Sequence, residues 1–276
     1  MTSLHALQTG MVALPPGYVF RGEPGGPLGR GVPADRYERC PIGAFLVEHP
    51  ERGPVLIDTG MHPDVARHPE RNLGRAGALL ARGVRMGDEE HVPAQLRARG
   101  IDPADVELVV MTHLHPDHTS AMSVLPRARF VVARDEWRAA RGRLAVLGGY
   151  LGRHLPDESR VQLVDLALHG RPWEGFERTL DLLGDGSLRL VSTPGHTVGH
   201  LSVVVATGDG PAFVLGDAVY TLRNLRDDVL PWRTASDGAS LETMRRLRAF
   251  AERRPGIPLI PTHDPDVWAE LLGSSG

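Results

Sequence analysis

The feature that most constrains this chain is a cluster of metal-binding side chains directly after an apolar run. The run 106–111 reads Val-Glu-Leu-Val-Val-Met. After one threonine, residues 113–118 read His-Leu-His-Pro-Asp-His. Side chains alternate faces along an extended chain, so His113 and His115 project the same way and can chelate one ion. The proline then turns the chain, which leaves Asp117 and His118 to reach a second ion. Imidazole and carboxylate groups suit zinc and neighbouring first-row divalent metals.

The same layout recurs three times further along the chain, where a lone His or Asp stands just past an apolar strand. These residues are His196 after 188–192, Asp217 after 212–216 and His263 after 257–261. Ligands in α/β folds gather at the carboxyl ends of strands, so the recurrence favours one shared site. A surface histidine would explain each position taken alone. The ligand count fits two ions: His113, His115 and His196 for one, Asp117, His118 and His263 for the other, and Asp217 as a bridge.

Composition excludes several classes of function. The chain has 276 residues, with 31 basic and 34 acidic side chains, a balance that argues against a nucleic-acid partner. Every basic residue is arginine, which excludes a Schiff-base lysine. The start of the chain does not resemble a signal peptide, and no stretch approaches the ~20 apolar residues of a membrane helix. We therefore expect no membrane partner and a cytoplasmic protein. Cys40, the sole cysteine, is expected to be buried.

The periodicity of the remaining sequence predicts a single α/β domain over 1–276. We expect 1–40 to be an N-terminal loop region and 134–182 a helical cap insertion, with apolar side chains that could serve a substrate groove or ordinary core packing. The final Gly-Ser-Ser-Gly predicts a loose tail. The other predicted elements are a hairpin of 42–48 and 54–60 turning at 50–53, a helix 89–99 ending at Gly100, strands 106–111, 129–133, 188–192 and 257–261, a hairpin of 201–206 and 212–216 turning at 209–210, and a helix 240–254 capped by Ser240 that buries Leu241, Met244, Leu247 and Phe250.

The ordered motifs resemble those of the metallo-β-lactamase superfamily over about 42–265, most of the chain. The motifs are Val-Leu-Ile-Asp-Thr-Gly at 55–60, the His-Leu-His-Pro-Asp-His cluster, Thr-Pro-Gly-His-Thr-Val-Gly-His at 193–200, Gly-Asp-Ala at 216–218 and Thr-His-Asp at 262–264. The resemblance implies an αββα four-layer sandwich with the metals at one edge of its two sheets. It also implies that Asp58 orients a metal ligand and that His200 supports the site without being a ligand.

Two residues refine the resemblance. Asp217 stands where several zinc β-lactamases have cysteine, and a bridging aspartate is typical of the dinuclear hydrolases. Tyr220, three residues later, is similar to the tyrosine of the quorum-quenching N-acyl-homoserine lactonases that hydrogen-bonds the substrate carbonyl. A packing tyrosine is the alternative. The resemblance implies an enzyme whose metal-bridging hydroxide opens a lactone ring, with Tyr220 on the carbonyl and Asp117 as both ligand and proton donor.

Several points stay open at this stage. A glyoxalase II-like thioesterase, or a phosphodiester or β-lactam hydrolase of the same superfamily, is the alternative function, and a metal-binding protein without activity is a third. Zinc is the expected metal, although iron, manganese or cobalt would suit the same ligands. A homodimer is expected only by resemblance. No acyl-chain preference follows from the sequence.

Overall fold

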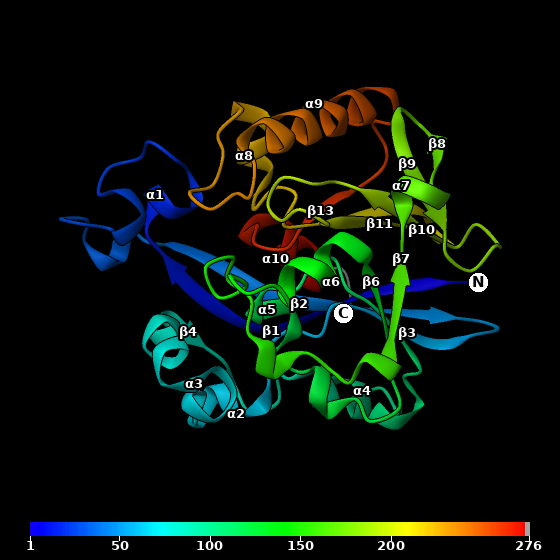
Figure 1. Cartoon of the computed structure of the whole chain (residues 1–276), viewed down its shortest axis with the longest axis horizontal. Coiled ribbons are helices and arrows are strands. Elements are labelled where there is room, and N and C mark those ends of the chain that lie inside the picture. Colours follow the sequence, from blue (N-terminus) through cyan, green and yellow to red (C-terminus); the bar gives the residue numbers. More distant parts are fainter. Residues whose placement is uncertain (274–276) are drawn as a thin grey trace. The chain divides into compact units, whose positions relative to one another are not determined.

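The computed structural model describes residues 1–273, apart from the side chains at 80 and 82, so most of the predicted tail lies outside the described residues. The chain divides into two compact units, where we expected one domain. The first comprises Met1–Val12, Pro41–Val164 and the residues from Glu270 onward, and the second comprises Ala13–Cys40 and Asp165–Ala269. Each unit contains a mixed sheet with helices, and the predicted α/β class with two sheets is confirmed (Figure 1).

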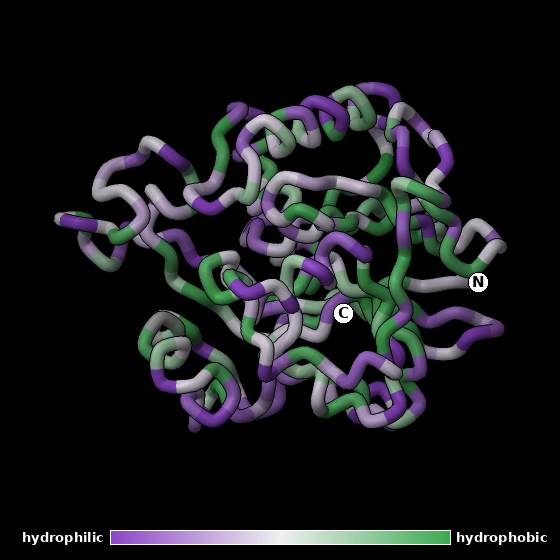
Figure 2. Tube along the Cα trace, in the orientation of Figure 1, coloured by the Kyte–Doolittle hydropathy of each residue, from purple (hydrophilic) through white to green (hydrophobic). Residues whose placement is uncertain are grey.

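The sheet of the first unit has seven strands in the order β4-β1-β2-β3-β5-β6-β7. The predicted hairpin is confirmed as the antiparallel pair β2 and β3, and β3, β5, β6 and β7 run parallel. The hairpin turn is hydrophilic and the central strands are hydrophobic (Figure 2). The bounds are β1 Ser3–Leu14, β2 Glu38–His49, β3 Gly53–Ile57, β4 Val84–Arg85, β5 Leu108–Val110, β6 Arg129–Ala133, β7 Val161–Val164, α2 Pro63–Arg67, α3 Pro69–Leu80, α4 Val92–Ala98, α5 Pro116–Thr119 and α6 Arg134–Ala140.

The parallel strands of this unit bring two of the sequence motifs together. Ile57, the last residue of β3, pairs with Val110, the last residue of β5. Neighbouring parallel strands end at the same edge, so Asp58 leaves the sheet beside the chain that leads into the histidine cluster. A buried apolar cluster that includes Leu56, Val109 and Phe130 packs around these strands.

The sheet of the second unit has six strands in the order β13-β12-β11-β10-β9-β8. Strands β8 to β12 pair antiparallel in succession, whereas β12 and β13 pair parallel. Strands β10, β12 and β13 therefore all end at one edge of this sheet. The bounds are α1 Pro16–Val19, α7 Leu166–His169, β8 Arg171–Trp173, β9 Phe176–Asp181, β10 Leu188–Ser192, β11 Leu201–Thr207, β12 Gly210–Gly216, α8 Leu222–Asp227, α9 Asp237–Arg253, β13 Leu259–Pro261 and α10 Pro265–Gly273.

Helix α9 covers one face of this second sheet (Figure 1). Met244, Leu247 and Phe250 are buried there as predicted, but Leu241 is 43% exposed. The predicted cap at Ser240 was wrong, because the helix begins one turn earlier and the side chain of Ser236 accepts the Ala239 amide. The buried stripe of this helix consists of Ser240, Thr243, Met244, Leu247 and Phe250, and Leu241 lies outside it.

Two further expectations were wrong in part. The N-terminal region 1–40 is not all loop, because 3–14 pairs into the first sheet as β1. The segment 134–182 is not a helical cap, since only α6 and α7 are α-helical and β7, β8 and β9 belong to the sheets. Cross-strand pairing, which local composition does not reveal, decided both. Among residues 1–273 no helix is long and apolar enough to span a membrane.

Candidate metal centre

The histidine cluster of the first unit occupies the segment that follows β5. His113 and His118 are fully buried and His115 is nearly so, while Asp117 is partly exposed. The rings of His115 and His118 lie 4.7 and 4.1 Å from the ring of His113, measured between centroids. Pro116 begins the short helix α5, where its missing N–H costs nothing, and that turn carries Asp117 and His118.

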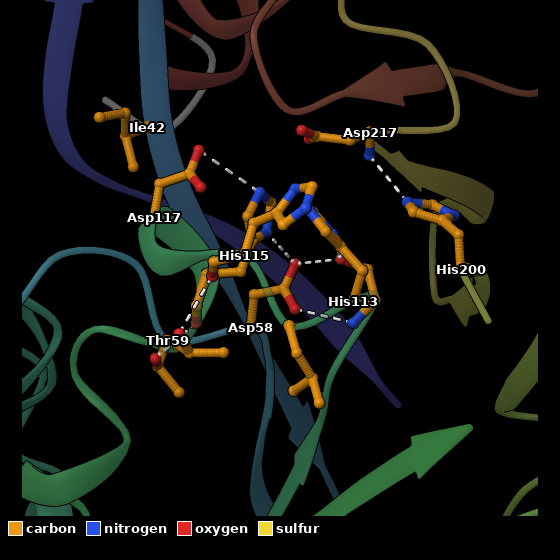
Figure 3. Close-up of polar contacts among 12 residues, drawn as sticks. Ile42, Asp58, Thr59, His113, His115, Asp117, His200 and Asp217 are labelled. Carbon is orange, nitrogen blue, oxygen red and sulfur yellow. Dashed lines mark hydrogen bonds and ion pairs between the residues drawn. The ribbon is translucent and has the colours of Figure 1, made fainter. Parts of the chain in front are cut away.

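Asp58 anchors this cluster through three hydrogen bonds (Figure 3). Its carboxylate accepts from the Thr112 amide at 2.8 Å, from the Thr112 hydroxyl at 2.7 Å and from His118 Nδ1 at 2.8 Å. Asp58 has φ +60°, a left-handed conformation that aspartate tolerates better than most residues. The predicted orienting role of Asp58 therefore has a direct contact behind it.

These bonds decide which nitrogen of each imidazole carries the proton. His118 Nδ1 donates to Asp58, so the lone pair is on Nε2. The Thr112 hydroxyl gives its single proton to Asp58 and therefore accepts from His113 Nδ1 at 3.1 Å, which puts the lone pair of His113 on Nε2 as well. A histidine that binds a metal must be held in one tautomer, and Asp58 and Thr112 hold these two rings with the lone pair on Nε2.

His115 is held differently, by the main chain of a distant turn. Its Nε2 donates to the Gly148 carbonyl at 2.9 Å, so its lone pair is on Nδ1. The Tyr150 ring lies 5.4 Å from the His115 ring. A Cβ atom on Gly148 would come within 2.8 Å of the Tyr150 ring, so this position has little room for a side chain.

Glu136 supports the same segment from α6. It is buried, and its Oε1 accepts from the Leu114 amide at 3.0 Å, between the first two histidines. Sequence reasoning missed Thr112, Glu136 and Gly148. Thr112 could have been flagged by its place next to the cluster, whereas the other two had no local signal.

In the second unit, His196, Asp217 and His263 follow β10, β12 and β13 and are buried. Asp217 Oδ2 lies 3.5 Å from His196 Nε2 and 3.2 Å from His263 Nε2. The prediction that strand ends would bring these three residues together is confirmed within this unit.

The loop that carries His196 is fixed by the start of α9. Gly195, at φ +143°, packs so closely on Ser240 that an added Cβ would lie 2.4 Å from its hydroxyl. The Gly195 carbonyl accepts from the Ala235 and Ser236 amides, and the Thr243 hydroxyl donates to the Pro194 carbonyl. Glycine at position 195 is therefore required for this close packing.

His200 fixes the backbone of Asp217 (Figure 3). The Asp217 amide donates to His200 Nε2 at 3.0 Å, so the ring proton is on Nδ1 and is donated to the Thr193 hydroxyl at 2.9 Å. The relay continues from Thr193 to the Ser202 hydroxyl and from there to the Leu215 carbonyl. Each donor in this buried chain has an acceptor, which holds Asp217 in a single position.

Tyr220 is buried between two of the candidate ligands. Its ring lies 5.4 Å from that of His196 and 5.1 Å from that of His263. Asp264, which sequence reasoning did not single out, accepts the Leu222 amide at 2.7 Å and so ties the chain after Tyr220 to the chain after His263. The Tyr18 ring stacks on the Tyr220 ring, with 6.4 Å between the two ring centroids.

The buried thiol of Cys40 is unsuited to metal binding. Burial raises its pKa, and the nearby carboxylates of Glu38, Asp217 and Asp264 raise it further. A thiol must lose its proton to bind a metal. Cys40 therefore stays a small buried apolar residue, as expected from the sequence.

The chain offers five imidazoles and two carboxylates as metal donors. Three imidazoles and one carboxylate belong to the first unit, and two imidazoles and one carboxylate belong to the second. This nitrogen and oxygen set fits zinc or another divalent first-row ion. The hydrogen bonds described above fix the tautomer of these rings, so each lone pair has a defined position, as metal binding requires. Each unit therefore contributes donors of the kind that bind divalent metal ions.

Comparison with protein families and relatives agrees with this chemistry. A model described as the metallo-beta-lactamase superfamily matches residues 37–263. An N-acyl homoserine lactonase AttM of Azorhizobium caulinodans is 34% identical over 255 residues, which cover 90% of each chain. An N-acyl homoserine lactonase of a Bacillus species is 27% identical over 79% of each chain.

Solved structures show the same fold. A structure of an N-acyl homoserine lactone hydrolase with N-hexanoyl-L-homoserine at its metal centre has a TM-score of 0.76 at 22% identity, covering 97% of this chain and 95% of that one. AidC, a dizinc quorum-quenching lactonase in complex with a product, has a TM-score of 0.65 at 17% identity, covering 96% and 88%.

Proposed function

This chain belongs to the metallo-beta-lactamase superfamily, and from that premise we propose that it is a metal-dependent hydrolase that opens the lactone ring of N-acyl homoserine lactones. The observation that carries the proposal is a complete donor set with a tyrosine packed against two of its histidines. Relatives named N-acyl homoserine lactonase, similar over nine-tenths of the chain, support the choice of substrate.

The donors divide between two ions in our proposal. His113, His115 and His196 would hold one, Asp117, His118 and His263 the other, and Asp217 would bind both through its two oxygens. When bound, such ions polarise a carbonyl and lower the pKa of water, so that a nucleophile is available near neutral pH. Zinc is the metal we propose, and the neighbour described as dizinc supports it. A homodimer and a cytoplasmic location remain predictions.

The protein's own groups would do the rest. The Tyr220 phenol would donate a hydrogen bond to the lactone carbonyl oxygen, which gains negative charge as the ring opens. Asp117, the one partly exposed member of its cluster, would deliver a proton to the ring oxygen as it leaves. The oxygen of a water molecule would bond to the carbonyl carbon as the ring C–O bond breaks. One proton of that water would reach the ring oxygen through Asp117 and the other would leave to solvent, so the products are a carboxylate and a hydroxyl on one N-acyl homoserine. His200 and Asp58 would hold the ligands in place without touching the substrate.

A competition among three substrates tests this proposal. Zinc-loaded protein would be given N-hexanoyl-L-homoserine lactone, a glutathione thioester and nitrocefin, with proton release or the colour change followed. We expect lactone opening to be fastest. We expect Asp217→Asn to lose metal and activity together, whereas Asp135→Asn, an exposed residue on α6, should lose neither. Rapid thioester cleavage without lactone opening would instead identify a glyoxalase II-like enzyme.

A further inference from the structure

The first unit contains a polar cavity that the proposed reaction does not use. Its volume is about 300 Å³, at the lower end of the range for small-molecule sites. It lies between α2, α3 and the segment around Arg153, and none of the proposed metal ligands lines it. This inference is independent of the lactonase proposal.

The floor of the cavity is held in one shape by neutral groups. The Ser120 hydroxyl donates to Asn72 Oδ1 at 2.6 Å and accepts from the His62 amide at 3.0 Å. Asn72 Nδ2 donates to the Ser120 carbonyl at 3.0 Å, so both ends of the amide are fixed. The buried His154 contacts the Thr119 hydroxyl and the Asn72 carbonyl. A ligand would therefore meet a surface that is already ordered.

The charge of the cavity comes from two arginines and one carboxylate. Arg71 lies in the first turn of α3, and Arg153 lies close by, with its Nη1 donating to the Arg71 carbonyl at 3.5 Å. Gly74, at φ +73°, interrupts the helical backbone of α3 next to this guanidinium. Among residues 1–273 neither guanidinium forms an ion pair with a carboxylate. Asp64 is the one acidic group in the lining.

The two histidines of the lining add no charge near neutral pH. Burial lowers the pKa of His154 to about 4 and also lowers the pKa of His62. Two positive groups then face one negative group, so a ligand with a negative charge is favoured. The planar guanidinium matches the oxygen spacing of carboxylates and phosphates and can donate two parallel hydrogen bonds.

We propose that this cavity binds a small organic oxyanion, a carboxylate or a phosphate, through the guanidinium groups of Arg71 and Arg153. Asp64 accepts a hydrogen bond from a hydroxyl or ammonium group of the same ligand, and Asn72 and Ser123 line the remainder of the site. The volume admits a metabolite of modest size.

Isothermal titration calorimetry of the zinc-loaded protein with sodium succinate and, separately, sodium phosphate tests the proposal. We expect a site that takes one anion per chain. The double variant Arg71→Ala, Arg153→Ala should weaken binding at least tenfold, because each lost charge-assisted hydrogen bond is worth about a factor of ten or more. Arg75→Ala is the matched control, since Arg75 is exposed on the same helix but does not line the cavity.

Each outcome of the titration decides the proposal. Binding of succinate alone or of phosphate alone, lost in the double variant and kept in Arg75→Ala, supports the site and decides between the two chemistries. If neither anion binds, the proposal is wrong. It is equally wrong if the double variant binds as tightly as the wild type, because the anion then occupies another place, such as the metal ions. Both arginines are exposed, so circular dichroism should show an intact fold in the double variant.

Discussion

Replacing Asp58 by asparagine should disable two of the proposed metal ligands, His113 and His118, through a single atom. The new amide side chain would keep the size of the carboxylate and tolerate the left-handed backbone at φ +60°. Its oxygen can still accept the Thr112 amide, but an NH₂ group would face the Thr112 hydroxyl and His118 Nδ1, which both now donate to a carboxylate oxygen.

The least costly rearrangement reverses two tautomers. His118 would accept at Nδ1 and carry its proton on Nε2. The Thr112 hydroxyl, no longer able to donate to the side chain at position 58, would donate to His113 Nδ1, which moves that ring's proton to Nε2 as well. Loss of one such supporting contact costs roughly 10- to 100-fold in metal affinity, and here two ligands depend on one side chain. We therefore expect a loss of zinc affinity of about 100-fold or more.

Zinc affinity of the metal-free variant would be measured by competition with a chelating dye, alongside urea unfolding. Because asparagine keeps the size of the carboxylate and its bond from the Thr112 amide, we expect the free energy of unfolding of the metal-free protein to change by only about 1 kcal/mol. Asp135→Asn serves as the control for a lost surface carboxylate. Wild-type affinity in Asp58→Asn would refute the tautomer argument, and a large loss of stability would show that Asp58 is mainly structural.

Three further changes test other parts of the account. Tyr220→Phe should keep both metals and lower kcat by roughly 10- to 1000-fold, as loss of one oxyanion donor can, and unchanged kinetics would leave Tyr220 a packing residue. His200→Ala should lower the stability of the metal-free protein by about 1–3 kcal/mol in urea, because the buried Asp217 amide loses its acceptor, and no change would show that water replaces the ring. His154→Gln should remove part of the acid sensitivity of the metal-free protein. Because the pKa of His154 is lowered in the folded protein, only the unfolded chain binds this proton between pH 6.5 and about 4. The free energy of unfolding of the wild type therefore falls by on the order of 3 kcal/mol as the pH drops across that window. Equal pH profiles of stability in the two proteins would contradict this assignment.

The strands and the candidate ligand residues were predictable because their signals are local. The predicted strands 129–133 and 188–192 have the same bounds as β6 and β10 in the structure. Polar residues that follow predicted strands of this kind were the candidate ligands. Register then follows from pairing: Asp58 reaches Thr112 because β3 and β5 are parallel neighbours. That contact could be suspected from the motifs but not located without the pairing.

The supporting contacts were not predictable, because they depend on chain segments brought close only by folding. The Gly148 carbonyl that holds His115 belongs to a turn 33 residues away, and any residue supplies a carbonyl. Glu136 carried no local sign of its bond to the Leu114 amide. For the same reason 134–182 was expected to be helical, since the short strands β8 and β9 are stabilised by their sheet partners more than by their own composition.

An anomalous difference map from crystals of the zinc-loaded protein tests the central claim most directly. The account predicts two peaks per chain, with one oxygen of the Asp217 carboxylate bound to each ion and the lone-pair nitrogens of His113, His115 and His118 pointing at them. A single peak, or peaks that Asp217 does not touch, would contradict it.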